Sequence, residues 1–348
     1  MSDVLPFLPC LIRSGGIVPS LGDPLVDEYL RFTAARVRPN TLAAQSFDLK
    51  VFFTVTAKGP LAVTVSDVLA FIEGQRAPRR GANVIRLADG EVGLAASTIK
   101  RRLATISSLY DYLVLRGHCD RNPVPRSMNA RGTRGSGSGA GARRGAPLVR
   151  APRKLPRVLT PAEVIALTGT LRTDRDRAMV ALMVHGGLRR CEVLGLRLQD
   201  VQVGDRRVFI VDGKGGHQRL VPVADLFFTA LAAYLSRERP PGADHDRVFV
   251  VLKGPNRGQP LSAAGLDEIL AGARGRAGLA HASCHELRHT CFTRLREGGM
   301  ALEAIQAQAG HASIETTRVY LHLSNDWLAG EYHKAMAIID TWDQEESR

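Results

Sequence analysis

Residues 186–196 read GGLRRCEVLGL. The adjacent glycines, Gly186 and Gly187, predict the end of one helix, and Arg189 stands where the next one begins. A guanidinium stays charged and carries five donors in a fixed geometry, which suits a two-point hold on a phosphate. Glu192 follows one helical turn later, where its carboxylate can orient Arg189. Because an arginine at a helix start is common, this segment alone is a weak indication of a phosphate site.

A second segment, GKGGHQRLVPV at residues 213–223, spans a glycine-rich turn between two predicted short strands at 207–211 and 218–221. Its glycines let the backbone come close to a ligand, and Lys214 projects from the turn. The segment lacks the Gly-x-x-x-x-Gly-Lys-Ser/Thr spacing and the strand–helix context of a nucleotide-binding P-loop. Taken alone, an ordinary exposed hairpin turn is the simpler interpretation.

A third segment, HELRH at residues 285–289, permits two interpretations. It matches the zinc-peptidase helix, in which two histidines on one face bind the metal, and Cys284 and Cys291 add further candidate ligands. The Gly-x-x-His extension that supplies a third ligand is absent. In the alternative, His285 and Arg288 share one helix face and point at an anion. A zinc peptidase has no use for the other basic segments, so we expect no metal.

The fourth segment, AGHASIETTRVYLH, occupies residues 309–322. Gly310 predicts the end of one helix, Ser313 caps the next, and Tyr320 falls near the end of that helix. His311 lies between the two helices. Considered singly, such a tyrosine is usually a packing residue, and such a histidine usually has local polar partners.

Together the four segments resemble the integrase or tyrosine recombinase family. The resemblance rests on six positions in the family's order: Arg189, Lys214, His285, Arg288, His311 and Tyr320. It covers about residues 155–342, with weaker helical agreement over 21–125. The chain departs from the family at His217, where many relatives carry another basic residue, and at Arg190 and Cys191, where small or apolar residues are frequent. None of these departures touches one of the six positions.

The resemblance implies a mainly α fold in two domains. A helical core-binding (SAM-like) DNA-binding domain is expected over residues 21–125, and a basic Gly/Arg-rich linker over 126–157. A mostly helical catalytic domain with a small β-sheet is expected over 158–342. About twenty residues precede the first predicted helix, so the simple Xer-like type without an arm-binding domain is expected.

The resemblance also implies the chemistry, which is cutting and rejoining of DNA through a 3′-phosphotyrosyl intermediate. Each of the six residues then has a role at one phosphate: Tyr320 as nucleophile, His285 as general base, Lys214 as the acid for the leaving 5′ oxygen, Arg189 and Arg288 on the non-bridging oxygens, and His311 as a further donor. Glu192 supports Arg189. No cofactor is expected.

Three alternatives remain at this point. A type IB topoisomerase-like enzyme shares the tyrosine chemistry but relaxes supercoils without exchanging partners. A DNA-binding regulator of the same fold keeps the domains without catalysis, although the six intact positions speak against it. A zinc peptidase is the third, and metal analysis distinguishes it.

Composition agrees with a large, nucleic-acid-binding protein. At 348 residues and 45% hydrophobic content, the chain can build two domains with real cores. Its 47 Lys and Arg exceed its 34 Asp and Glu, and the net charge of +13 favours a polyanionic partner, nucleic acid first and an anionic membrane second. The resemblance implies that this partner is double-stranded DNA. No apolar run is long enough to span a membrane. The five scattered cysteines favour a reducing cytoplasm. The resemblance implies a bacterial, nucleoid-associated protein.

Periodicity and capping residues predict the elements. Residues 21–125 are predicted to be all-helical, with helix starts at Asp23, Asn40, Ser66 or Asp67, and Ser97, and an exposed loop over about 74–96. Beyond the linker, Thr160 with Glu163 predicts another helix start. Further helices are predicted near 174–186, 189–195, 224–238, 262–273, 285–297, 302–309, 313–320 and 326–340.

Two regions are predicted to meet partners. Lys100, Arg101 and Arg102, in the first turns of the longest helix, and Arg153 and Lys154, in the linker, are candidate DNA-binding residues. The alternatives are a solvated basic face and a plain spacer. The last helix, within 326–342, carries an apolar stripe. The resemblance implies that this stripe docks on a neighbouring copy in a tetramer on DNA; the alternative is packing on its own domain. Accessory DNA-bending proteins are further candidate partners.

Overall fold

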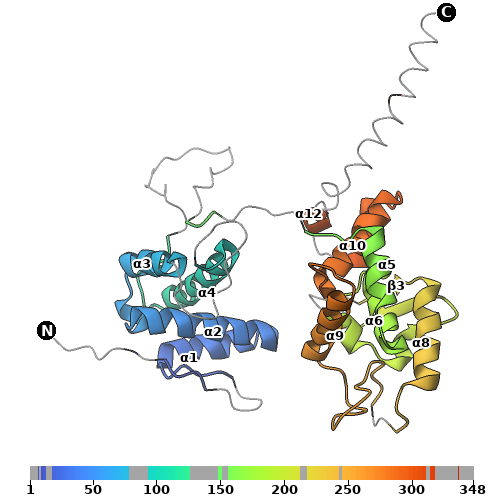
Figure 1. Ribbon diagram of the computed structural model, residues 1–348. Coiled ribbons are helices and arrows are strands. Elements are labelled where there is room, and N and C mark those ends of the chain that lie inside the picture. The colour runs from blue at the N-terminus through green and yellow to red at the C-terminus, as the bar shows by residue number, and fades with distance from the viewer. Residues whose placement is uncertain are drawn as a thin grey trace, which may run out of the picture. The chain divides into compact units, whose positions relative to one another are not determined.

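The computed structural model describes residues 7, 9–12, 18–77, 93–125, 148–150, 156–211, 218–242, 245–310, 314–317 and 336 (Figure 1). The chain divides into two compact units, Met1–Arg153 and Lys154–Arg348, and each has its own apolar core. Both units are mainly helical, and the second contains a small sheet. The predicted mainly α fold is confirmed.

The N-terminal unit is helical in all its described elements. These are α1 (Pro24–Ala34), α2 (Pro39–Thr56), the 3-10 turn η1 (Pro60–Ala62), α3 (Val65–Arg76) and α4 (Ala96–Leu115). The side chain of Asp23 accepts hydrogen bonds from the backbone N–H groups of Leu25 and Val26 at 3.0 and 3.1 Å, as its cap position predicts. Most of the predicted loop, from residue 78 to 92, lies outside the described residues.

Two predicted helix caps are wrong by two or three residues. Helix α2 begins at Pro39 rather than after Asn40, because proline lacks the N–H that a first turn leaves unpaired and has a helical φ already set. Helix α3 is capped by Thr64 rather than by Ser66 or Asp67. Asp67 is the third helical residue and accepts the backbone N–H of Thr64 at 2.8 Å, which completes a capping box.

Aromatic side chains fill the core of the N-terminal unit. The ring of Phe52, on α2, lies 5.1 Å from that of Phe71, on α3, in an edge-to-face arrangement. Tyr110, on α4, is buried in the same core and donates its hydroxyl hydrogen to the Pro60 carbonyl at 2.8 Å. Burial of the ring therefore leaves no unpaired hydroxyl behind.

The C-terminal unit contains the remaining elements. Its helices are α5 (Pro161–Gly169), α6 (Asp174–Val184), α7 (Arg190–Gly195), η2 (Leu198–Asp200), α8 (Asp225–Arg237), α9 (Ala263–Arg276), α10 (Cys284–Glu297), α11 (Leu302–Ala309) and α12 (Ile314–Thr317). Helix α6 packs against α8 and α10, and its residues from Ala178 to Val184 are all buried (Figure 1). The predicted last helix lies outside the described residues, apart from Met336.

A three-stranded antiparallel sheet lies in this unit, in the order β1 (Val201–Gln202), β2 (Arg207–Ile210) and β3 (Arg219–Pro222). The sequence predicted β2 and β3 but not β1, whose two residues are too few to show an alternating pattern. Val208 pairs with Val221, and Ile210 pairs with Arg219. Since directly paired residues project from the same face of a sheet, Arg219 lies on the face that buries Val208 and Val221.

Among the residues that the structure describes, no helix is long and apolar enough to cross a membrane.

Candidate active site

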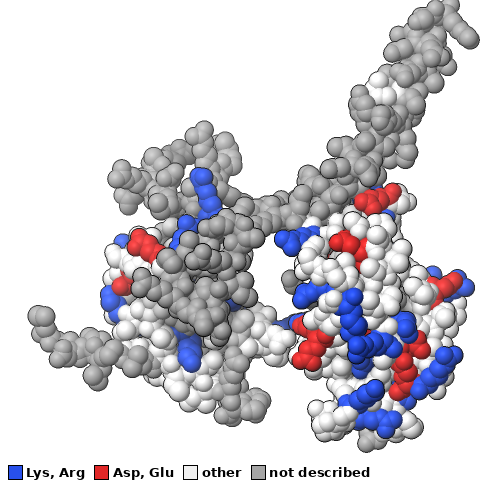
Figure 2. Space-filling view, in the orientation of Figure 1, with Lys and Arg blue, Asp and Glu red and all other residues white. Residues whose placement is uncertain are grey.

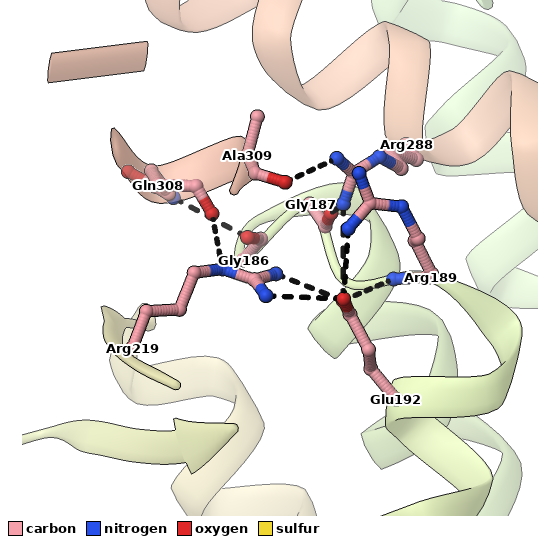
Figure 3. Close-up of polar contacts among 8 residues, drawn as sticks. All are labelled: Gly186, Gly187, Arg189, Glu192, Arg219, Arg288, Gln308 and Ala309. Carbon is pink, nitrogen blue, oxygen red and sulfur yellow. Dashed lines mark hydrogen bonds and ion pairs between the residues drawn. The ribbon is translucent and has the colours of Figure 1, made fainter. Parts of the chain in front are cut away.

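Glu192 lies at the centre of a cluster of three arginines (Figure 3). It is on α7, directly after the break at Gly186 and Gly187, and is only 4% exposed. Its Oε2 accepts the backbone N–H of Arg189 at 2.9 Å, and its Oε1 accepts Nη1 of the same residue at 2.9 Å. One carboxylate therefore closes the first turn of α7 and also orients the Arg189 side chain.

Two further guanidinium groups face this carboxylate. Arg219, on β3, donates from Nη1 to Oε1 at 3.0 Å and from Nη2 to Oε2 at 2.8 Å, and Nη1 of Arg288, on α10, is 3.8 Å from Oε2. Burial by itself would raise the pKa of Glu192, but Arg219, and then Arg189, outweigh it and hold the pKa below its usual value. One carboxylate facing three guanidinium groups leaves a net positive charge that favours an anion.

Arg288 connects the cluster with the break before α7 and with the end of α11. Only 4% of this residue is exposed, and it donates to the Gly187 carbonyl and, from Nη2, to the Ala309 carbonyl at 2.7 Å (Figure 3). Its guanidinium carbon also lies 4.8 Å from the centroid of the Phe292 ring, a cation–π distance. Arg288 therefore connects the helix break before α7 with the end of α11.

The end of α11 has two further links to the cluster. Arg219 donates from Nε to the Gln308 carbonyl at 2.8 Å, and Nε2 of Gln308 donates to the Gly186 carbonyl at 3.3 Å. Gly310 then ends α11 with φ 59°, a left-handed conformation that glycine adopts without strain. His311 is the next residue and lies outside the described residues.

Gly187 tests how tightly this cluster is packed. Its φ is +67°, and a Cβ placed on it would lie 2.7 Å from Cε1 of Phe292, the ring under Arg288. We expect Gly187→Ala to lower the free energy of unfolding by about 3 kcal/mol, from backbone strain and overpacking together. Urea titration followed by circular dichroism measures this change.

Gly278→Ala is the matched control for Gly187→Ala. Gly278 has φ +66°, but its added Cβ would meet no atom within 4 Å, so this variant carries the strain alone, about 1 kcal/mol. Equal losses for the two variants would contradict the close packing of Gly187 against Phe292.

His285 and His289 form a pair on α10, the helix that carries Arg288. Their Nε2 atoms are 2.9 Å apart and the rings meet edge to face. Desolvation, and then the charge of Arg288, lower the pKa of His285. Desolvation, and then His285 and Arg288, lower the pKa of His289 to about 4. Both imidazoles are therefore neutral at neutral pH. A neutral His285, exposed to solvent, is in the state that can take a proton.

The structure brings together three of the residues singled out from the sequence: Arg189, Glu192 and Arg288. Lys214, His311 and Tyr320 lie outside the described residues, so their roles stay predictions. Sequence reasoning missed Arg219 as a member of the cluster. The alternation of side chains along the predicted strand could have identified it. Arg219 is two residues from Val221, so the two side chains project from the same strand face, and the burial of Val221 places Arg219 toward the interior.

The histidines and cysteines of the zinc-peptidase interpretation do not gather into a metal site. Within the described parts of the chain, no group of three or more His, Cys, Asp or Glu side chains is placed to hold a metal ion. Cys284 and Cys291 are buried, and burial raises the pKa of their thiols to about 11 and about 12. Protonated thiols are poor metal ligands.

The candidate DNA-binding residues of the N-terminal unit differ in exposure. Arg102 is only 7% exposed, donates to Gln75 and lies 3.7 Å from the buried Asp48, so it serves the packing of the helices rather than a phosphate. Arg101 also pairs with Asp48, but its side chain is half exposed, and Lys100 is exposed. Of the three cations, Lys100 and Arg101 remain candidates. Arg153 and Lys154 lie outside the described residues.

The surface of the C-terminal unit carries many cations. Figure 2 shows Lys and Arg side chains running down its visible face, with smaller acidic areas between them. Ion pairs such as Arg190–Asp267 and Arg197–Asp246 neutralise some of the surface cations of this unit locally.

The chain is similar in sequence to known DNA recombinases. The model of the phage integrase family matches residues 157–326. The tyrosine recombinase XerC of Xylella fastidiosa is 34% identical over 249 residues, which are 70% of this chain and 76% of that protein. XerC of Pelobacter propionicus is 29% identical over 338 residues, which are 93% of this chain and 99% of that protein.

The fold is similar to that of solved structures. The match to the Tn1549 transposon integrase in complex with circular intermediate DNA covers 86% of this chain and 95% of that one, with a TM-score of 0.61 and 16% identity. The XerH site-specific recombinase bound to its palindromic difH substrate covers 89% and 84%, with a TM-score of 0.59 and 19% identity. At such identities the likeness establishes the fold.

Proposed function

Because the chain belongs to the phage integrase family of tyrosine recombinases, we propose that it cuts and rejoins DNA at a phosphate facing the arginine cluster around Glu192. The protein is a site-specific DNA recombinase, an enzyme whose substrate is DNA. The observation that carries the proposed site is the buried Glu192 carboxylate, which gathers Arg189, Arg219 and Arg288 at one helix start.

The cluster suits the transition state of phosphoryl transfer. A phosphodiester repels nucleophiles, and negative charge on its non-bridging oxygens grows as the phosphorus becomes five-coordinate. Arg189 and Arg288 are the proposed donors to these oxygens, and His311 adds another. The Arg189 side chain is 19% exposed, against 9% for Arg219 and 4% for Arg288, so Arg189 is the arginine of the cluster most accessible to an incoming phosphate.

In the proposed cleavage step the phenol oxygen of Tyr320 attacks the phosphorus. His285 takes the phenol proton, a bond forms between phosphorus and the tyrosine oxygen, and the bond from phosphorus to the 5′ oxygen breaks. Lys214 gives a proton to that leaving oxygen. The 3′-phosphotyrosyl link conserves the phosphodiester energy, so a 5′-hydroxyl from another strand can reverse the step. Oxidation states do not change and no cofactor takes part.

The role of His285 predicts a pH dependence of cleavage. A general base must be neutral, and the pKa of His285 lies below the ordinary value of 6.5. The cleavage rate is therefore expected to stay level as the pH falls to 6.5 and to drop only below it, as the imidazole gains its proton. Single-turnover formation of the covalent adduct from about pH 5 to pH 8 measures this profile.

His285→Gln is the control for this profile. It should be slow at every pH and should lose the acid-side drop, since no imidazole remains at that position. A drop centred above pH 6.5 in the unchanged protein would assign the base to another group.

The assembly proposed here is a tetramer that holds two DNA sites. Segment 326–342 would dock on a neighbouring copy through its apolar stripe, and accessory DNA-bending proteins would assist. Lys100 and Arg101 are the proposed phosphate contacts of the N-terminal unit, since both are exposed on α4. We expect the protein in the bacterial cytoplasm, at the nucleoid, where such DNA is found.

The products of the reaction test the proposed function. DNA that becomes covalently attached, selected from a randomised pool, identifies the site. Two copies of that site are then placed in one supercoiled plasmid. A recombinase yields deletion or inversion products with new joints, whereas a type IB topoisomerase yields only relaxed circles. A silent regulator yields neither product, although it binds the site.

A further inference from the structure

We propose that Arg219 is a positioning residue for strand cleavage, which acts mainly through Glu192 on Arg189 and, to a smaller extent, through a separate contact with the end of α11. This inference rests on the proposed function, and it assigns a role to a residue outside the six family positions. Arg219 lies on β3, whereas Arg189 caps α7 and Arg288 lies on α10.

The contacts of Arg219 are all directed at the site. Its two terminal nitrogens meet the two carboxylate oxygens of Glu192 at 3.0 and 2.8 Å, a two-point contact, and its Nε donates to the Gln308 carbonyl at 2.8 Å. The side chain is 9% exposed. Three of its five N–H donors, one on each guanidinium nitrogen, thus bind protein acceptors, and together with its burial this makes Arg219 a support of the site rather than a contact of the substrate.

Arg219 neutralises most of the negative charge on the buried Glu192 carboxylate. Arg189 and Arg219 compete for the same carboxylate, and the two-point contact satisfies most of its charge from the strand side. Arg189 then makes only one side-chain hydrogen bond to it, from Nη1. Without Arg219, the buried carboxylate would draw Arg189 inward to replace the lost donors, because an uncompensated buried charge is costly. Arg189 would then hold a phosphate less well.

Arg219 also fixes the place where α11 ends. A Cβ on Gly310 would come within 3.1 to 3.2 Å of the Arg219 guanidinium, so the chain runs directly beside it. Gln308, whose carbonyl Arg219 holds, is followed by Ala309, whose carbonyl Arg288 holds. Two arginines on different elements therefore set two successive carbonyls just before His311 in the sequence.

The test compares Arg219→Gln with Arg219→Lys and with the unchanged protein. The single-turnover rate of adduct formation is measured at saturating protein, at a temperature where every variant is fully folded by circular dichroism. The dissociation constant for DNA is measured separately. Misplacing a phosphate-binding group by about 1 Å costs about 100-fold in rate, so we expect a loss of that size for Arg219→Gln. Arg219→Lys, which keeps the charge but not the two-point contact, should lose about 10-fold, and binding should change less than about threefold.

Arg276→Gln is the matched control. Arg276, on α9, also donates from Nε and Nη2 to a carbonyl, that of Thr170, but contacts no member of the cluster. It should leave the rate unchanged. The path through Glu192 is tested by placing Arg219→Gln in a Glu192→Gln background, where its further effect on the rate should shrink to less than about fivefold.

Two results overturn the inference. One is cleavage by Arg219→Gln within threefold of the unchanged protein; the other is the full 100-fold loss persisting in the Glu192→Gln background. If the unchanged protein forms no adduct at all, the proposed function itself fails, and that outcome is distinct because it precedes any substitution. If Arg219→Gln does not fold, the rate of Arg219→Lys decides, since a residue with only a packing role would retain the unchanged rate.

Discussion

Replacing Glu192 by alanine is expected to lower the free energy of unfolding by about 3–5 kcal/mol, because three guanidinium groups would stay in the interior with no counter-charge. Both oxygens of this carboxylate are in use, with Arg219 at 2.8 and 3.0 Å and Arg189 at 2.9 Å. Helix α7 would also lose the acceptor that closes its first turn. Urea titration followed by circular dichroism measures the loss.

Asp267→Ala is the control for the loss of Glu192. Asp267 also pairs with an arginine, Arg190, but about half of each side chain is exposed. Such a pair contributes about 1 kcal/mol or less. A Glu192→Ala variant no less stable than Asp267→Ala would mean that the cluster does not hold the site together.

Replacing Arg189 by glutamine is expected to slow strand cleavage by about 1000-fold, the cost of losing one donor to a developing negative charge. The protein should stay folded, because Glu192 keeps its two-point contact with Arg219. Quenched time courses on a DNA substrate, resolved on denaturing gels, measure the rate, and anisotropy measures binding.

Arg190→Gln is the neighbour control for Arg189→Gln. Arg190 follows Arg189 in the chain, but its side chain is 45% exposed and pairs with Asp267. Cleavage by this variant should remain within about threefold of the unchanged rate. Similar slowing by both variants would indicate a general effect of positive charge on DNA binding rather than a specific role of Arg189.

Local signals made much of the fold predictable. Helix starts depend on a few neighbouring residues, so Asp23 at α1 and Thr160 with Glu163 at α5 were found correctly. Prediction was wrong where two local signals compete. At α2, Pro39 takes the first helical position ahead of Asn40, and Asp67 serves as the partner of the cap rather than as the cap.

The candidate site was only half predictable, since its charges are arranged by tertiary contacts. Arg189 and Glu192 are one turn apart, so their pairing could be inferred from spacing. Arg219 is 27 residues from Glu192, and only the burial of one face of β3 brings the two together. Arg102 shows the converse: its basic neighbours suggested a DNA contact, yet Asp48, on another helix, draws it into the core.

The most direct test of the whole account is to identify the residue that becomes attached to DNA. The protein is reacted with a DNA site nicked so that the released 5′-hydroxyl end diffuses away, and the trapped adduct is digested and sequenced by mass spectrometry. The account predicts a 3′-phosphate on the peptide that carries Tyr320, and no adduct from Tyr320→Phe, which still binds the same DNA. An adduct on another residue, or one that persists in Tyr320→Phe, would contradict it.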